Sequence, residues 1–396
     1  MKKNRETFFG TLLLGVVLLL LPLVGWGQTI FELPKPTQFE AGVPRNKLAV
    51  VKEIPNEFGD DEFMATPFLV TANKSGTIYV SDSIRNKVFM FNNRFEYIGN
   101  FLESGRGPRE AFPGRNSLIM IYTGQNQKFY IQDTFNDKII EFSESGKYLR
   151  DMKTNRLKIA YSFFIPVVDK GNAFYAYSLT GGIVDQLDNK MKVAHSYLKE
   201  ELNERYIYYR PDFEKYYEES KANFEKKHPG KKSRWGQKKR WLIPNFHNVK
   251  YDLTSSGLLL IYLMNSSTVY LFDGKKLVRS FPVWIDNVLT AYKEDVDEGL
   301  KISQKVRPGY VSKSYSPMFK ICVVDQDQPF FYLQNYRGKK EGFKIYQFDL
   351  NGKLVKIMSF PSHLVVTLHA KKNGLFYCLA EKDEEKYVVV MKPVDQ

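Results

Sequence analysis

Apolar and polar residues alternate along most of this chain, in short runs rather than in long segments. The runs are rich in aromatic residues, which make up 15% of the sequence, and they end at Gly, Asn or Asp. Alternation with a period of two is typical of half-buried β-strands, and Gly, Asn and Asp favour the turns between them. The pattern predicts an all-β fold of many short antiparallel strands.

A repeat with an offset of 51 residues organises these runs. The stretch GTIYVSDSIRNKVFMFNNRFEYIG (76–99) aligns with QKFYIQDTFNDKIIEFSESGKYLR (127–150). The aligned pairs are Ile78 with Phe129, Asp82 with Asp133, Lys87 with Lys138, Val88 with Ile139 and Phe91 with Phe142. Each copy is interpreted as a small antiparallel sheet, in which a carboxylate after the strand shapes the turn.

The same strand type recurs further along the chain, at 172–178, 257–263 with 268–281, 329–335 with 344–360, and 374–380. With the two aligned segments this gives six units. A single sheet of this kind cannot bury both of its faces, whereas six sheets arranged radially bury them against one another. The predicted fold is a six-bladed β-propeller over residues 28–396, with segment 29–52 completing the last blade.

Two long connections interrupt the period. Residues 199–241 lie between the third and fourth units, and a helix is expected there, because Pro211 and Asp212 suit a first turn and aromatic residues follow at helical spacing. Residues 288–310 lie between the fourth and fifth units and carry a weaker helical pattern. We therefore expect a helical, basic insertion between blades three and four.

The N-terminus has the pattern of a secretory signal peptide over residues 1–27. Lys2, Lys3 and Arg5 precede a long apolar run that ends in small residues at Gly25 and Gly27. An uncleaved membrane anchor is the alternative, since the run approaches the ~20 residues that span a bilayer. Pro22 favours cleavage, and no cysteine near the end of the run could carry a lipid anchor. The expected location is periplasmic or secreted.

The formal net charge is +14, from 58 Lys and Arg against 44 Asp and Glu. Export makes nucleic acid the least favoured partner, and it leaves an unknown protein or an anionic glycan or lipid surface. The best candidate for such a contact is a basic run with interleaved tryptophans. Its residues are Lys226, Lys227, Lys231, Lys232, Arg234, Trp235, Lys238, Lys239, Arg240 and Trp241. A solvated loop, or a contact with the Glu-rich segment before it, is the alternative.

The stretch ESGRGPREAFPG (103–114) concentrates glycine, proline and arginine. It lacks the G-x-x-x-x-G-K-[ST] order of a phosphate loop, and no helix pattern follows it. We interpret it as a rigid corner between two blades, in which Glu110 could accept hydrogen bonds from backbone donors. Arg106 and Arg109 remain candidates for contact with an acidic ligand.

Catalytic and metal motifs are not readable. The five histidines show no metal-binding spacing, and no nucleophile elbow is present, so no catalytic, metal or cofactor residue is assigned. Cys322 and Cys378 both sit among apolar residues and are expected to be buried thiols, with a disulfide as the alternative.

The blade pattern YVSDSIRNKVFMF and the stretch SGRGPREAF resemble the exported six-bladed propellers of Bacteroidetes-type bacteria, which are similar to NHL-repeat and TolB-like propellers. Gly105, Gly107, Pro108 and Glu110 match the G-x-G-P-x-E part of that motif, while Ala111 stands where an aromatic residue is expected. The resemblance implies the fold and little about activity. Related propeller lactonases hold calcium in the central channel, a role open to Asp82, Asn86 and Asp133, although turn capping explains these residues as well.

The sequence thus favours a non-enzymatic propeller that binds a ligand or protein at the cell envelope. The alternative is a calcium-dependent lactonase or lyase with its site in the central channel. Several carboxylate or amide side chains converging on the ring axis would favour the enzyme.

Overall fold

A computed structural model of the chain describes residues 35–58, 62–82, 84–100, 102–111, 119–133, 136–154, 167–177, 183–198, 225–226, 229–230, 249–264, 266–291, 319–335 and 343–394. The chain divides into two units, Met1–Lys35 and Pro36–Gln396. The first unit contains only one described residue, so everything below concerns the second. The predicted signal peptide, 1–27, lies outside the described residues.

Four antiparallel sheets of four strands follow one another along the chain. The first contains β2 (Pro67–Ala72), β3 (Ile78–Asp82), β4 (Lys87–Phe91) and β5 (Tyr97–Asn100). The second contains β8 (Ile119–Thr123), β9 (Phe129–Asp133), β10 (Lys138–Phe142) and β11 (Tyr148–Lys153). The third contains β12 (Val167–Val168), β13 (Phe174–Tyr177), β14 (Val184–Leu187) and β15 (Val193–Tyr197). The fourth contains β16 (Val249–Leu253), β17 (Leu259–Leu263), β18 (Thr268–Asp273) and β19 (Lys276–Pro282).

The remaining long strands form one eight-stranded sheet in the order β20-β21-β22-β23-β1-β26-β25-β24. Its strands are β1 (Arg45–Ile54), β20 (Phe319–Val324), β21 (Phe330–Asn335), β22 (Lys344–Asp349), β23 (Leu354–Ser359), β24 (Val365–Lys372), β25 (Leu375–Lys382) and β26 (Glu385–Val394). Strand β1 pairs antiparallel with β26 and parallel with β23. The first described strand therefore completes the last sheet, as the sequence predicted for segment 29–52.

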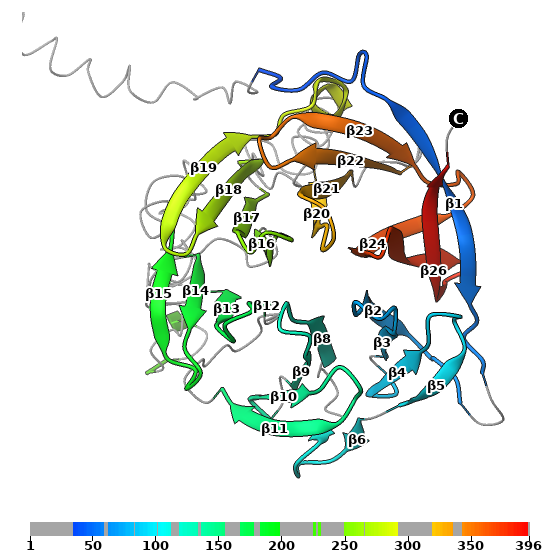
Figure 1. Cartoon of the computed structure of the whole chain (residues 1–396), viewed down its shortest axis with the longest axis vertical. Coiled ribbons are helices and arrows are strands. Elements are labelled where there is room, and N and C mark those ends of the chain that lie inside the picture. The colour runs from blue at the N-terminus through cyan, green and yellow to red at the C-terminus, as the bar shows by residue number, and fades with distance from the viewer. Residues whose placement is uncertain are drawn as a thin grey trace, which may run out of the picture. The chain divides into compact units, whose positions relative to one another are not determined.

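The sheets are arranged as in a propeller. Figure 1 shows six strands nearest the centre, and these are here called the first strands. They are β2, β8, β12 and β16, one from each four-stranded sheet, and β20 and β24, the two edge strands of the eight-stranded sheet. Each of these strands contacts the next, and β24 contacts β2, so they form a closed ring. The sequence predicts six separate blades, whereas the structure has one eight-stranded sheet in place of the last two. This sheet arises because β1, which is the fourth strand beside β24, β25 and β26, also pairs with β23.

The 51-residue repeat is confirmed as a structural repeat. Strands β3 and β9 begin at Ile78 and Phe129, and β4 and β10 begin at Lys87 and Lys138. Every residue of β3 and β9 is buried. The rings of Tyr79 and Phe129 stack with centroids 4.2 Å apart and so pack one sheet against the next. The aromatic positions that reveal the repeat are therefore contacts between sheets.

The two long connections lie mostly outside the described residues. Within 199–241 the structure describes only residues 225–226, which are helical, and the turn at 229–230. Within 288–310 it describes 288–291, the end of a short helix that begins at 286. The helical insertion thus stays a prediction. In the part of the chain that is described, no helix is long and apolar enough to cross a membrane.

Strand β1 offers a test of ring closure. Ile54 is fully buried at the end of β1, whereas Val51 on the same strand is 41% exposed. We expect Ile54→Ala to lower the free energy of unfolding by about 2–5 kcal/mol, because it leaves a cavity between β1 and its neighbours. Val51→Ala should change it by less than about 1 kcal/mol. Urea unfolding of both variants measures the difference, and equal effects would show that β1 packing does not hold the sheet.

Candidate functional site

Within the stretch 103–114 the structure describes residues 103–111, and these form a corner between the first and second sheets, as predicted. Strands β6 (Glu103–Ser104) and β7 (Glu110–Ala111) pair parallel, and the N–H of Gly107 donates a 2.6 Å hydrogen bond to Glu110 Oε2. The Lys138 amine donates to the carbonyl of Gly107 at 2.7 Å and ties the corner to the second sheet. Glu110 therefore has the capping role that the sequence predicts for it.

Arg106 and Arg109 are exposed on this corner, and Arg109 adopts a positive φ of 67°. Figure 1 places β6 at the outside of the ring, next to β5 and β11. The structure does not bring these two arginines to the centre. A role for them in ligand contact remains a prediction. The basic run, with Lys231, Lys232, Arg234, Trp235, Lys238, Lys239 and Arg240, lies outside the described residues.

Asp82 and Asp133 are turn caps at the ends of β3 and β9. Asp82 is fully buried and accepts hydrogen bonds from the backbone N–H groups of Ala65, Thr66, Ile84 and Arg85, at 2.6–2.9 Å. Asp133 accepts from the backbone and side chain of Asn136. Both carboxylates already have donors from the protein, as the turn-capping interpretation requires.

A polar cluster that the sequence did not single out lies on the first strands, at the centre of the ring. Tyr122, on β8, donates its hydroxyl to Asp252 Oδ1, on β16, over 3.1 Å. Gln326, which follows β20, donates to the Leu253 carbonyl at 3.2 Å and to Asp252 Oδ2 at 3.4 Å. Asp252 is thus contacted from two other sheets.

Burial raises the pKa of Asp252 to about 6. The backbone N–H of Leu253, the Tyr122 hydroxyl and the charge of Lys372 each oppose this rise, because they stabilise the carboxylate. Burial, together with the nearby Asp252 charge, holds the pKa of Tyr122 well above its usual value. Asp252 can therefore gain or lose a proton near neutral pH, while Tyr122 stays a hydrogen-bond donor.

Basic and thiol groups surround this carboxyl. Burial lowers the pKa of Lys250, on β16, and of Lys372, on β24. It lowers the pKa of His369 to about 3, with further contributions from the charges of Lys250 and Lys386, so the imidazole is neutral. Burial raises the pKa of the Cys322 thiol, which is therefore protonated and a poor nucleophile. Cys322 and Cys378 are free thiols, so the disulfide alternative is wrong.

This donor set does not fit calcium, which prefers several oxygen ligands. Of the groups just described, only Asp252 is a carboxylate, and the charge that acts on it is that of the Lys372 amine. Among the described residues no three His, Cys, Asp or Glu side chains are gathered as metal ligands. The arrangement can instead bind a charged ligand, and it can transfer a proton through Asp252.

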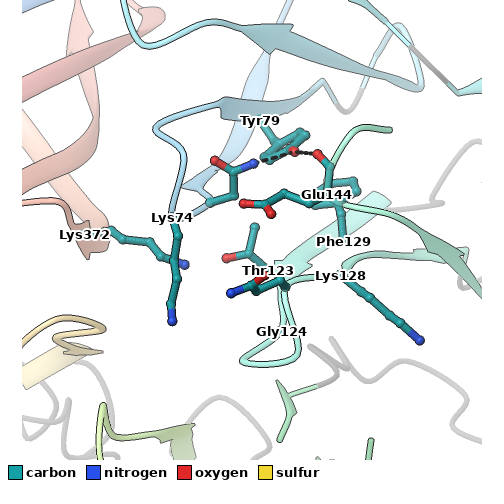
Figure 2. A pocket seen from close by; sticks show the side chains of 10 residues that line it. Lys74, Tyr79, Thr123, Gly124, Lys128, Phe129, Glu144 and Lys372 are labelled. Carbon is teal, nitrogen blue, oxygen red and sulfur yellow. Dashed lines mark hydrogen bonds between the residues drawn. The ribbon is translucent and has the colours of Figure 1, made fainter. Parts of the chain in front are cut away.

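A pocket adjoins this cluster on the side of the ring where each first strand turns into the second, here called the turn side. It lies where β24, β2 and β8 end, and Lys372, Lys74 and Thr123 contribute to its lining. Its other lining residues are Asn73, Tyr79, Gly124, Gln127, Lys128, Phe129 and Glu144. Figure 2 shows Lys74 and Lys372 together on one side of the pocket, with Lys128 extending away from them.

Sequence reasoning missed the central cluster because its contacts are remote in sequence. Tyr122 and Asp252 are 130 residues apart. One signal was present: in VKYDL (249–253), Lys250 and Asp252 are two residues apart in a strand, and such residues share one face. The polar residues of the site thus lie on the strand that precedes a strand of the aromatic repeat, as β16 precedes β17.

No family model matches the sequence, and no curated protein matches it. Among solved structures, a Bacteroides fragilis protein described as exported has a TM-score of 0.51 and 9% identity, covering 89% of this chain and 99% of its own. A DUF4221 family member from Bacteroides vulgatus has a TM-score of 0.48 and 9% identity, covering 89% and 99%. A streptogramin B lyase has a TM-score of 0.44 and 11% identity, covering 88% and 87%. The likeness to the Bacteroides fragilis protein shows a shared fold and nothing about activity.

The raised pKa of Asp252 predicts how stability depends on pH. In the folded state the carboxyl keeps its proton up to about pH 6, whereas the unfolded chain loses it near 3.8. Stability therefore falls as the pH rises through this window. Asp252→Asn removes the titration, so the variant should gain stability over the wild type by up to about 3 kcal/mol between pH 4 and pH 7. Urea unfolding at several pH values measures this.

Tyr122→Phe serves as the companion variant. It keeps the carboxyl but removes a hydrogen bond that favours its charged form, so the loss of stability should continue to higher pH than in the wild type. If the free energies of unfolding of Asp252→Asn and the wild type differed by the same amount at every pH, the expectation would be contradicted.

The corner offers a second prediction. A Cβ atom at Gly105 would lie 2.0 Å from Glu110 Oε2, so Gly105→Ala must displace the carboxylate that caps Gly107. We expect Gly105→Ala and Glu110→Ala each to cost about 1–3 kcal/mol, mostly through the same lost hydrogen bond. The double variant should therefore cost clearly less than the sum. Additive losses in urea unfolding would show that the two residues act independently.

Proposed function

We propose that the protein is an exported, non-enzymatic six-bladed propeller that binds a ligand or partner at the centre of the ring, on its turn side. Counting six blades means taking the eight-stranded sheet as two blades, β20–β23 and β24–β26 with β1, joined through the parallel pairing of β1 and β23. The closed ring of six first strands supports this count.

One observation carries the proposed binding role: charged and polar side chains from separate sheets meet at the centre. Tyr122, Asp252 and Gln326 are joined by hydrogen bonds across the ring. Lys250 and Lys372 add positive charge beside them. A rigid scaffold that presents a few convergent polar groups is the usual form of a ligand site, and the function of a propeller depends on such groups rather than on the fold.

Two observations support export. The first 27 residues have the order of a signal peptide, basic and then apolar and then small. The Bacteroides fragilis protein that shares the fold is described as exported. We therefore propose a periplasmic or secreted protein of the cell envelope. The run from Lys231 to Arg240 is a further proposed contact with an anionic glycan or lipid surface.

An enzyme of the lactonase or lyase kind is the second candidate, and the observation that favours it is Asp252. A carboxyl with a pKa of about 6, held by Tyr122, is suited to general acid–base chemistry near neutral pH. Product formation from a bound ligand would favour this candidate over the binding module. Stoichiometric calcium in the purified protein would favour the calcium-dependent form.

A thermal-shift screen of neutral and anionic small ligands tests the proposed site. A ligand at a hundred times its Kd should stabilise the protein by about 2.7 kcal/mol, seen as a rise in Tm. We expect the rise to be lost in the double variant Lys250→Met, Asp252→Ala and kept in the control Arg106→Ala, Arg109→Ala. A ligand whose effect depends on the two arginines instead would place the working surface at the outer corner.

A further inference from the structure

We propose that the pocket on the turn side binds an oxyanion group, a carboxylate or a phosphate carried by the ligand, between the amines of Lys372 and Lys74. This rests on the proposed binding function and names the chemistry of its ligand. The pocket lies where three neighbouring first strands end, so its position is fixed by the ring rather than by a long loop.

Lys372 is the residue that carries the proposal. Among the described residues three lysines are buried, namely Lys138, Lys371 and Lys372. Lys138 donates to the Gly107 carbonyl and to Asp151, and Lys371 lies 3.7 Å from Asp325. The Lys372 amine, on a side chain only 5% exposed, makes no hydrogen bond or ion pair within the described part of the chain.

Burying an amine is costly when no group at hydrogen-bond distance replaces its lost hydration. The adjacent residue, Lys371, shows how the protein meets this cost elsewhere, with a buried carboxylate on the neighbouring sheet half. Lys372 opens instead into the pocket, where a bound oxyanion would supply the missing acceptor. The lowered pKa of Lys372 agrees with this, because burial outweighs the opposing charges of Asp327, Asp252 and Glu144.

Among the described residues no carboxylate lies within ion-pair distance of the Lys372 or Lys74 amine, although the charges of Asp327, Asp252 and Glu144 reach Lys372 from farther away. Lys74 is exposed and follows β2, and it raises the positive potential around Lys372. Lys128 contributes little, because its amine is paired with the buried carboxylate of Glu141. Glu144 lines the pocket, and together with Asp327 and Asp252 it opposes the two lysines. An oxyanion at hydrogen-bond distance from the two amines would lie closer to them than these carboxylates do, and Glu144 weakens the attraction.

The pocket also limits what can enter it. The volume open to a bound atom is about 10 Å³, close to the space of one water molecule. Tyr79 and Phe129, stacked on each other, form part of the wall, and the Tyr79 hydroxyl is already engaged by Asn73 and the Glu144 carbonyl. Such a site accepts one oxygen atom of the charged group, while the rest of the group and of the ligand lies outside the pocket.

Isothermal titration of the purified full-length chain with inorganic phosphate, D-glucuronate and D-glucose tests the inference at constant ionic strength. The two anions should bind and glucose, the neutral match for glucuronate, should not. Lys372→Met and Lys74→Met should each weaken binding by at least about tenfold, the loss expected for one charge-assisted hydrogen bond. Tighter binding of phosphate than of glucuronate would point to a phosphorylated ligand, and the reverse to an acidic sugar.

Three further variants sharpen the test. Lys275→Met removes the same charge from an exposed turn on the fourth sheet and should leave binding unchanged. Glu144→Gln removes the opposing carboxylate and should tighten binding several-fold. Lys372→Arg keeps the charge and should retain most of the affinity, which separates a lost contact from a misfolded variant.

The outcomes distinguish this inference from the function on which it rests. Anion binding that is indifferent to Lys372→Met overturns the inference, and so does the absence of binding by either anion. If the binding of a neutral ligand found in the thermal screen still requires Asp252 in that case, the proposed binding function stands and only the oxyanion chemistry is wrong. If no ligand depends on Asp252 or Lys372, both fail.

Discussion

The arrangement depends on one strand that is shared between two sheet halves. Strand β1 forms antiparallel hydrogen bonds with β26 and parallel ones with β23, and so joins the first described strand to the last. The segment before it adds further ties: Glu40, only 3% exposed, accepts from Tyr346 and Arg45, and Gln38 bonds with Gly352 and Leu354. Together these bonds tie the segment before β1, and β1 itself, to the last strands of the chain, and so they keep the ring closed.

Closure of the ring decides which residues meet at its centre. The first strand of each sheet must face the others across a narrow space, so its polar residues meet one another rather than solvent. Tyr122 and Asp252 are hydrogen-bonded to each other there. Lys372 departs from this rule and lies where the space opens to the turn side. The closed ring therefore explains why Tyr122 and Asp252 meet at the centre, and why the Lys372 amine lies at a pocket.

Local sequence patterns were enough to predict the fold, but they did not predict the site. The alternation and the 51-residue offset located the strands, because Tyr79 and its counterpart Tyr130 each pack against an aromatic ring of the next sheet. The corner at Glu110 was also readable, since its glycines and carboxylate act within a few residues of one another. The contact between Tyr122 and Asp252 depends on which strands face each other across the ring, and no spacing in the sequence encodes that. The joining of the two halves of the eight-stranded sheet through β1 also depends on closure of the ring.

The pairing of β1 with β26 also has a consequence for the order of events as the chain emerges. A chain that leaves the ribosome or crosses a membrane from its N-terminus presents β1 long before β26 exists. Until the last residues arrive, the edge of β1 that pairs with β26 has unpaired N–H and C=O groups, which can recruit other strands. The contacts that close the ring span almost the whole chain, and contacts of such separation form slowly. The interval before closure is therefore when the protein is most open to misassembly, and a chaperone that covers a strand edge would act in that interval.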